Sequence, residues 1–131
     1  MIFMEYHFCG CVISDLEKIK YFIDSRMEEL TRYITDDSKM FEIKLIVNEL
    51  VINGALHGNE LSRKKTVFVN IDLNGDMLFI KVQDEGKGIK YQMEDYNPYD
   101  MSSSGRGLVL VNGLVDELKL DKNTIRAIIN L

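Results

Sequence analysis

Glu49, Asn53 and His57 place a carboxylate, a carboxamide and an imidazole at every fourth position of one segment. On an α-helix this spacing puts the three side chains along one face. A Glu and an Asn among Leu, Val and Ile are costly if they are buried without partners, so they are either hydrogen-bonded by neighbours or line a cavity. The pattern alone leaves both interpretations open.

The chemistry of these three side chains suits a metal-bound phosphate. Mg²⁺ prefers oxygen ligands and keeps several waters, which an amide oxygen can join. A nearby carboxylate can accept a proton from a hydroxyl or a water that attacks a terminal phosphate. We therefore predict Asn53 as a metal ligand and Glu49 as the general base. His57 either contacts phosphate or caps the last carbonyls of its helix.

Asp84 follows a predicted strand directly, and Gly86 and Gly88 come after it. A carboxylate can accept a hydrogen bond from an exocyclic amine such as adenine N6. Glycines allow the chain to turn with positive φ and to approach a base closely. The alternative is a plain surface turn after a strand.

The stretch Gly105, Arg106, Gly107 and Leu108 opens a predicted helix. Free N–H groups and the positive end of the helix dipole suit an anion there, and glycines remove the Cβ atoms that would block a phosphate. The alternative is a Gly-rich loop before a packed helix. Neither G-x-x-x-x-G-K-[ST] nor G-x-G-x-x-G between a strand and a helix occurs in the chain.

Alternation and helical periodicity predict the elements that must position these residues. Ser14 and Glu17 form a capping box that opens the first helix. Gly58 suits a left-handed position after the second helix, and Asn74-Gly75 indicates a type I′ hairpin turn. The expected strands are 3–12, 66–73, 77–83, 116–120 and 124–131, the expected helices are 14–35, 36–57 and 105–115, and 85–104 is a long loop.

Length and element order predict one domain over residues 1–131 with an α+β architecture, in which strands pair antiparallel and helices cover one face. Lys and Arg number 16 against 21 Asp and Glu, a net charge of −5 that argues against a nucleic-acid binder. No basic leader is visible, and no stretch reaches the ~18 apolar residues of a membrane span. We expect a cytoplasmic protein with no direct nucleic-acid or membrane contact.

Cys9 and Cys11 lie one residue apart on the predicted first strand, on the same side as His7. A disulfide at that spacing would be strained. The three side chains could offer ligands to a soft metal. The interpretation that we favour is a pair of buried, reduced thiols.

In combination and order, these stretches resemble the GHKL ATP-binding family, and within it the bacterial anti-sigma factor serine/threonine kinases. The segment with Glu49, Asn53, His57 and Gly58 is the most specific part. The resemblance implies a two-layer sandwich with a mixed, mostly antiparallel sheet covered on one face by three helices, with ATP and Mg²⁺ bound between. It also implies a homodimer, a STAS-type anti-anti-sigma phospho-acceptor and a sequestered sigma factor.

By the same resemblance, Glu49 is the base, Asn53 holds Mg²⁺ and Asp84 reads adenine. Gly86 and Gly88 shape the base pocket, and the glycines of the 105–108 stretch wrap the phosphates beneath a lid over about 89–104. Thr124 matches a position that helps the Asp bind the base. Two departures are visible: Ser102, Ser103 and Ser104 stand where such kinases often carry an Arg, and Asn123 replaces the usual Gly before Thr124.

Overall fold

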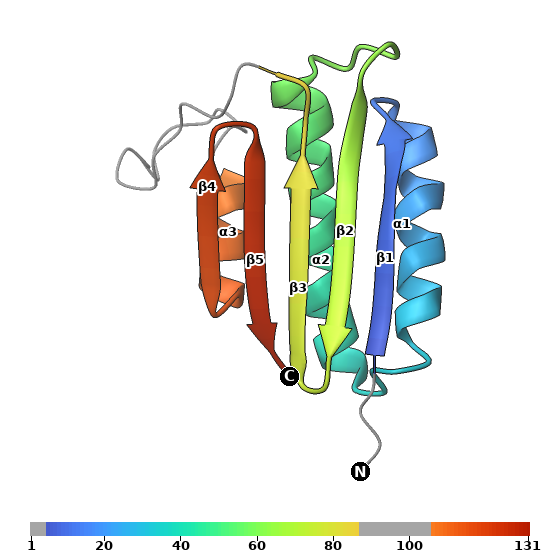
Figure 1. The fold of residues 1–131 in the computed structure, drawn as a ribbon, viewed down its shortest axis with the longest axis vertical. Coiled ribbons are helices and arrows are strands. Elements are labelled where there is room, and N and C mark those ends of the chain that lie inside the picture. Colours follow the sequence, from blue (N-terminus) through green and yellow to red (C-terminus); the bar gives the residue numbers. More distant parts are fainter. Residues whose placement is uncertain (1–4, 87–105) are drawn as a thin grey trace.

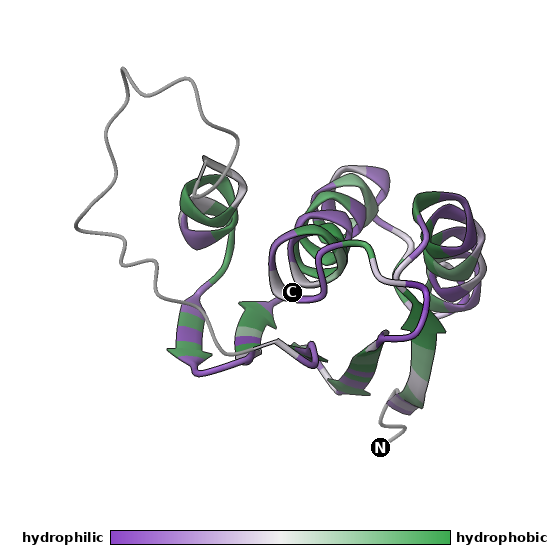
Figure 2. Ribbon diagram, turned by 90° about the horizontal axis from the view of Figure 1, so that it is seen from above, coloured by the Kyte–Doolittle hydropathy of each residue, from purple (hydrophilic) through white to green (hydrophobic). Residues whose placement is uncertain are grey.

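The structure is a computed structural model that describes residues 5–86 and 106–131. Five strands form one sheet in the order β1-β2-β3-β5-β4. Every pairing between neighbouring strands is antiparallel. Figures 1 and 2 show α1, α2 and α3 together on one face of this sheet, which confirms the two-layer α+β architecture. Gly88, Gly105, the expected lid and the part of the expected loop beyond Gly86 lie outside the described residues.

The strand bounds follow the predicted pattern closely, whereas the first helix ends at Leu30, five residues before its predicted end at Thr35. The strands are β1 (Glu5–Ile13), β2 (Thr66–Asn74), β3 (Met77–Gln83), β4 (Glu117–Asp121) and β5 (Thr124–Asn130). The helices are α1 (Leu16–Leu30), α2 (Asp37–Asn53) and α3 (Arg106–Leu114), with one π-helical turn, η1 (Gly54–Gly58), directly after α2.

The core lies between the helices and the sheet. Alternate residues of β2 face the helices, and Val67, Val69, Ile71 and Leu73 are buried there, as the period of two predicts. Ile43, Ile46, Val47 and Leu50 of α2 are fully buried against this surface. In Figure 2 the hydrophobic colour of the helices is turned toward the sheet.

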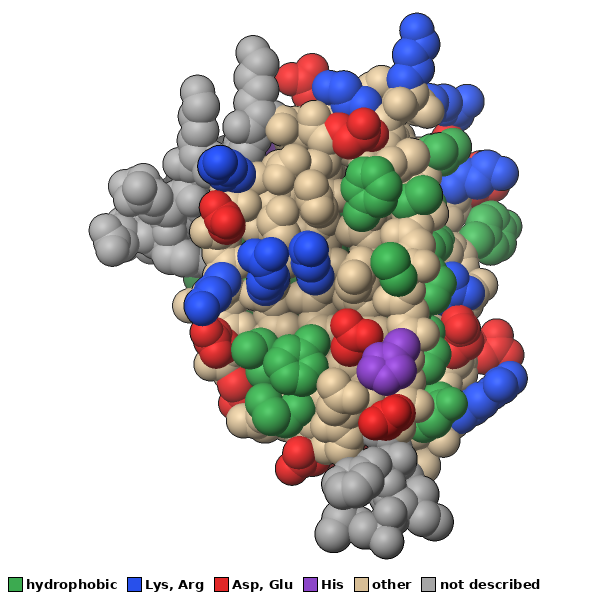
Figure 3. All heavy atoms as spheres, in the orientation of Figure 1, with side chains coloured by type: hydrophobic (Ala, Val, Ile, Leu, Met, Phe, Trp, Pro, Cys, Tyr) green, Lys and Arg blue, Asp and Glu red, His purple; other side chains and the backbone are tan. Residues whose placement is uncertain are grey.

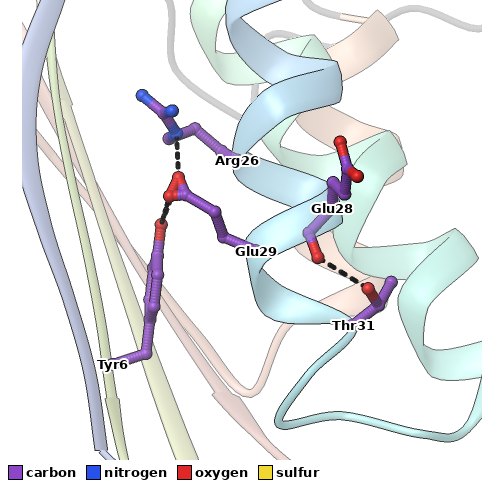
Figure 4. A network of polar contacts seen from close by, with 5 residues as sticks. All are labelled: Tyr6, Arg26, Glu28, Glu29 and Thr31. Atoms are coloured by element: carbon purple, nitrogen blue, oxygen red, sulfur yellow. Dashed lines mark hydrogen bonds and ion pairs between the residues drawn. The ribbon is translucent and has the colours of Figure 1, made fainter.

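The edge strand β1 is fastened to α1 by a polar and aromatic cluster (Figure 4). The Tyr6 hydroxyl lies 3.3 Å from both carboxylate oxygens of Glu29, and Arg26 Nε lies 2.6 Å from Glu29 Oε1. The Arg26 guanidinium also stacks over Phe8, 4.3 Å from the ring centroid. Burial, together with the Glu29 carboxylate, raises the pKa of Tyr6 to about 12.

The start of α1 differs from the predicted capping box. Asp15 is the N-cap, and its Oδ1 accepts hydrogen bonds from the backbone N–H groups of Glu17 and Lys18. Ser14 is instead buried and donates through Oγ to the Lys65 carbonyl. The N-cap lies one residue later than predicted, at Asp15, because the Ser14 hydroxyl is used in a tertiary contact.

The end of α2 also differs from the prediction. The helix widens into the π-turn η1, and Gly58 does not have the left-handed backbone expected of it. Positive φ angles occur just beyond, at Glu60 (53°) and Leu61 (54°). A π-turn inserts a residue into the helical ladder and is often found at functional sites.

The β2–β3 hairpin turns on Gly75 and Asp76, because Asn74 pairs directly with Met77. Gly75 has a φ of 62°, and it is the first of the two central residues. Positive φ at the first central position alone is the type II′ pattern, so the predicted type I′ turn on Asn74-Gly75 is wrong by one residue.

Cys9 and Cys11 are exposed, so the prediction of buried thiols is wrong. The helices cover the face of β1 that carries Tyr6 and Phe8, and alternation turns the odd residues outward. Within the described residues, no cluster of three His, Cys, Asp or Glu side chains could hold a metal ion. His7 pairs with Asp72 at 2.9 Å. None of the described helices is long and apolar enough to cross a bilayer.

Candidate functional site

The predicted face of α2 opens onto a small cavity where α2 and η1 meet α3. Glu49, Asn53 and His57 all line it, so the structure brings together the three residues that the helical spacing placed on one face. Gly107 and Leu108 of α3 form the opposite wall. The complete lining in the described residues is Glu49, Ile52, Asn53, Leu56, His57, Gly107 and Leu108.

Gly107 approaches the Glu49 carboxylate very closely. A Cβ atom added at Gly107 would overlap Glu49 Oε2 and would lie 3.1 Å from Glu49 Cδ. Gly107 is the second residue of α3, in the first turn, whose N–H groups have no intrahelical partners. A carboxylate is favoured beside such a helix start, where the dipole is positive. The glycine is therefore needed for the contact between the candidate base and the candidate phosphate loop.

The cavity measures about 100 Å³. Typical small-molecule clefts measure roughly 300–1,000 Å³. The space between Glu49, Asn53 and Gly107 is thus large enough for a hydrated ion or part of a phosphate chain. A larger ligand would have to extend beyond it.

Asp84 lies on the other side of the same π-turn. It is 4% exposed, and a Cβ atom added at Gly58 would overlap its carboxylate. Asp84 Oδ1 accepts a hydrogen bond of 2.7 Å from Gly86 N. Burial raises the pKa of Asp84, an effect that the Gly86 hydrogen bond and the charge of Lys65 oppose.

Three glycines therefore allow close approaches at the two ends of the site. Besides Gly58 and Gly107, a Cβ atom added at Gly86 would overlap the Gly58 carbonyl oxygen. Gly54 is different: a Cβ atom there would meet Val67 at 3.5 Å and Asp84 Cβ at 3.6 Å, which are ordinary contact distances. The close approach to the Asp84 carboxylate is made four residues later, at Gly58.

Asn123 holds the backbone of Asp84 from the β4–β5 turn. Its carbonyl accepts from Asp84 N at 3.0 Å, and its Nδ2 donates to the Asp84 carbonyl at 2.7 Å. Thr124, predicted to assist Asp84, is buried opposite Gln83, and its hydroxyl lies 3.4 Å from Asn123 Oδ1. Among the described contacts, Asn123 is the residue of this turn that reaches Asp84 directly.

Asn59 is the positioning residue that sequence reasoning missed. It is fully buried, and its Oδ1 accepts from Glu85 N at 2.7 Å. Its Nδ2 lies 2.9 Å from both Ser14 Oγ and the Thr66 carbonyl. Glu85 in turn accepts from Thr66 N. An Asn next to a glycine at a predicted helix end was the available signal, but its partners are up to 45 residues away in sequence.

Residues 13–129 match the family model of the histidine kinase-like ATPase domain. The chain belongs to this family. The match spans both ends of the site, from Ser14 beneath Asn59 to the β5 strand that follows Asn123. The predicted family resemblance is confirmed.

Several curated proteins named anti-sigma F factor are similar to this histidine kinase-like ATPase domain. The chain is 28% identical over 106 residues to the protein from Bacillus licheniformis, 27% to that from Bacillus subtilis and 30% to that from Bacillus thuringiensis. Each alignment covers 77% of this chain and 66% of the relative. The aligned part therefore spans slightly less than two thirds of the length of these relatives.

The donor set of this histidine kinase-like ATPase site fits a hard cation and a nucleotide. Asn53 and Glu49 supply oxygen atoms to one cavity wall, and the described residues contain no group of three His, Cys, Asp or Glu that could bind a metal alone. Mg²⁺ usually takes one or two protein oxygens and completes its shell with water and phosphate. The buried Asp84 carboxylate, held on both sides of its backbone, suits a donor on a flat base. Arg106 begins α3, and its side chain lies outside the described part.

Proposed function

We propose that the protein is a Mg-ATP-dependent serine/threonine protein kinase that acts as an anti-sigma regulatory factor. The observation that carries the proposal is the contact of the Glu49 carboxylate with Gly107, in one cavity with Asn53 and His57. The family and the relatives named anti-sigma F factor support the same class of activity. The proposed phospho-acceptor is a Ser or Thr of a STAS-type anti-anti-sigma protein, and the proposed target of sequestration is a sigma factor.

Each residue has a defined role in this proposal. Asn53 would hold Mg²⁺ through its amide oxygen, and the Asp84 carboxylate would accept a hydrogen bond from the adenine amine. Gly107 and Leu108 would border the phosphates. Bound Mg-ATP supplies the phosphoryl group and leaves as ADP. Glu49 would accept the proton of the acceptor hydroxyl as that oxygen becomes bonded to phosphorus.

The decisive experiment compares the chain with its Glu49→Gln variant. Both are incubated with labelled ATP and a STAS-type acceptor, and label on the acceptor is measured beside nucleotide binding by calorimetry. We expect Glu49→Gln to reduce phosphotransfer by at least about 100-fold, in the range of general-base catalysis, and to leave ATP affinity within about threefold. Full phosphotransfer by the variant would remove Glu49 from the mechanism.

A second candidate function is an ATP- or ADP-gated binding module without phosphotransfer, or a slow ATPase. The sequence observation that favours the binding module is Ser102, Ser103 and Ser104 in place of an Arg. The ATPase would result if Glu49 activated a water instead of an acceptor hydroxyl. Label on the acceptor would exclude the binding module. Steady phosphate release without any acceptor would identify the ATPase.

The proposal includes a homodimer, which sedimentation at micromolar concentration would test.

A further inference from the structure

The sheet face turned away from the helices carries three cations on three neighbouring strands. Lys81 of β3 lies opposite Arg126 of β5, and Arg126 lies opposite Lys119 of β4. Because neighbouring strands are about 4.8 Å apart, the row is only about 10 Å long. Figure 3 shows Lys and Arg side chains gathered in a band across this face. This charge is concentrated in a protein whose net charge is −5.

The row has no evident role in stability. Like charges directly opposite each other destabilise a sheet, and Arg126 has a cation on both sides. The ion pair that the described residues form with the row joins Lys119 Nζ to Glu117 Oε1 at 3.6 Å, with side chains 71% and 51% exposed. A pair as exposed as this contributes little. The described residues therefore offset little of this repulsion.

An apolar pair borders the row. Phe79 and Ile128 lie opposite each other, each two residues along its strand from a cation of the row. They and the cations line a hollow of about 480 Å³ in the open face. Asp72 and Glu117 stand at the two ends of the apolar pair, opposite Phe79 and Ile128 respectively. The hollow thus combines a cationic side, an apolar floor and two acidic ends.

We propose that this hollow is a docking site for an acidic, amphipathic segment of a partner protein. The site, called here the cationic sheet patch, consists of Lys81, Arg126, Lys119, Phe79 and Ile128. Carboxylates of the partner would lie along the row, and a neighbouring large apolar side chain would enter the hollow over Phe79 and Ile128.

The shape of the cationic sheet patch favours a helical segment that lies across the strands. Residues i and i+4 of an α-helix have Cβ atoms about 6 Å apart, close to the spacing of cations on neighbouring strands. Residues i+3 and i+7 then form an adjacent stripe, which matches the apolar pair beside the row. Carboxylates at i, i+4 and i+8 would engage all three cations.

The charges around the patch disfavour two other classes of ligand. Recruitment to acidic membranes typically uses clusters of 4–8 Lys or Arg. A nucleic-acid surface is a broad basic stripe on a basic domain. Here three cations are bordered by Asp72 and Glu117 on an acidic protein. An acidic protein segment with a limited charge is the ligand that this arrangement fits.

The test uses a fluorescent helical peptide with Glu at i, i+4 and i+8 and Leu at i+3 and i+7, beside a matched peptide with Gln in place of Glu. Binding to the full chain is measured by anisotropy. We expect the Glu peptide to bind at least about tenfold more tightly than the Gln peptide. The triple variant Lys81→Gln, Arg126→Gln, Lys119→Gln should lose at least about tenfold, since each exposed pair contributes modestly. Lys20→Gln, an exposed cation of α1, is the matched control and should change nothing.

A second readout separates docking from folding. Neutralising Arg126 relieves repulsion, so Arg126→Gln should keep or raise the melting temperature while it weakens peptide binding. Unchanged ATP binding by the triple variant would show that the loss is independent of the nucleotide site.

Four outcomes would overturn the proposal. A lower melting temperature for Arg126→Gln would show that the cationic row stabilises the fold. Equal binding of the two peptides would show that the row does not recognise carboxylates. Tighter binding of single-stranded RNA or of anionic vesicles than of the peptide would assign the patch to another ligand. Dissociation of a dimer by the triple variant, with no competition by the peptide, would make the face an interface between two copies of the chain.

Discussion

The two ends of the candidate site hold their key carboxylates in different ways. Asp84 is short, buried and fixed: Asn123 bonds both its backbone N–H and carbonyl, and Gly86 N bonds its side chain. Asn59 fastens the next residue, Glu85, to Ser14 and Thr66. Glu49 is longer, partly exposed and positioned by the close approach of Gly107.

This difference matches the different tasks proposed for the two carboxylates. A group that reads the shape of a base gains from a rigid setting, because preorganised contacts lose little entropy on binding. A base that receives a proton during transfer must adjust to the acceptor and to the phosphate. The turn after β3 is thus the preorganised end of the site, and the α2–α3 contact is the adaptable end.

Among the changes that test this comparison, removal of the Asn59 side chain should have the largest effect on stability. Asn59→Ala leaves Glu85 N and the Thr66 carbonyl without their partner, so we expect a loss of about 3 kcal/mol in the free energy of unfolding. Urea denaturation measures it. Asn123→Ala is the matched control on the other side of Asp84, and because Asn123 is only partly buried its cost should be smaller. Equal losses in the free energy of unfolding would show that Asn59 and Asn123 contribute equally to holding this turn.

Gly58→Ala should come next. Its methyl group overlaps the fixed Asp84 carboxylate, and overpacking of this kind costs about 1–3 kcal/mol. Adenine-nucleotide binding should be lost as Asp84 is displaced. Gly54→Ala, four residues earlier, meets only ordinary contacts and should stabilise the helix by up to about 1 kcal/mol. Effects of the same sign at both positions would contradict the role given to Gly58.

Gly107→Ala should cost less stability than Gly58→Ala, although its methyl group overlaps a carboxylate equally closely. The Glu49 side chain has more torsions and partial exposure, so it can move aside at a cost of about 1 kcal/mol or less. Phosphotransfer should fall much more than stability. Gly113→Ala in the same helix has no atom within 4 Å of its added Cβ and is the control. A loss of stability as large as that of Gly58→Ala would remove the contrast between the two ends.

Asp84→Asn should have the smallest effect on stability, and the size of this effect should depend on pH. Burial raises the folded-state pKa of Asp84 above its unfolded value, so protonation favours the folded state. The stability linked to this proton is present below the unfolded pKa and is lost as pH rises through the folded pKa. The Asn variant should therefore gain stability relative to the natural chain as pH rises through that window, while it binds adenine nucleotides more weakly. Thermal melts between pH 3 and 7 measure the difference.

Local patterns predicted most of the elements and half of the site. Alternation gave β2 and β3, and the spacing of four placed Glu49, Asn53 and His57 on one wall. These features depend on neighbours within a few residues, for which helix and strand geometry is fixed. The same local reasoning gave the wrong cap at Ser14 and the wrong turn at Asn74, because the tertiary partner Lys65 and the strand register decided those positions.

The sequence by itself thus determined the layers, the family and the types of side chain available for chemistry. Only the tertiary structure decided how they are positioned. Asn59, Asn123 and the open-face row that contains Arg126 join residues far apart in the chain, and their roles arise from hydrogen bonds and strand pairings that a local pattern does not contain. The roles of Gly58 and Gly107 were also decided by the tertiary structure, because each glycine leaves room for a carboxylate from another element.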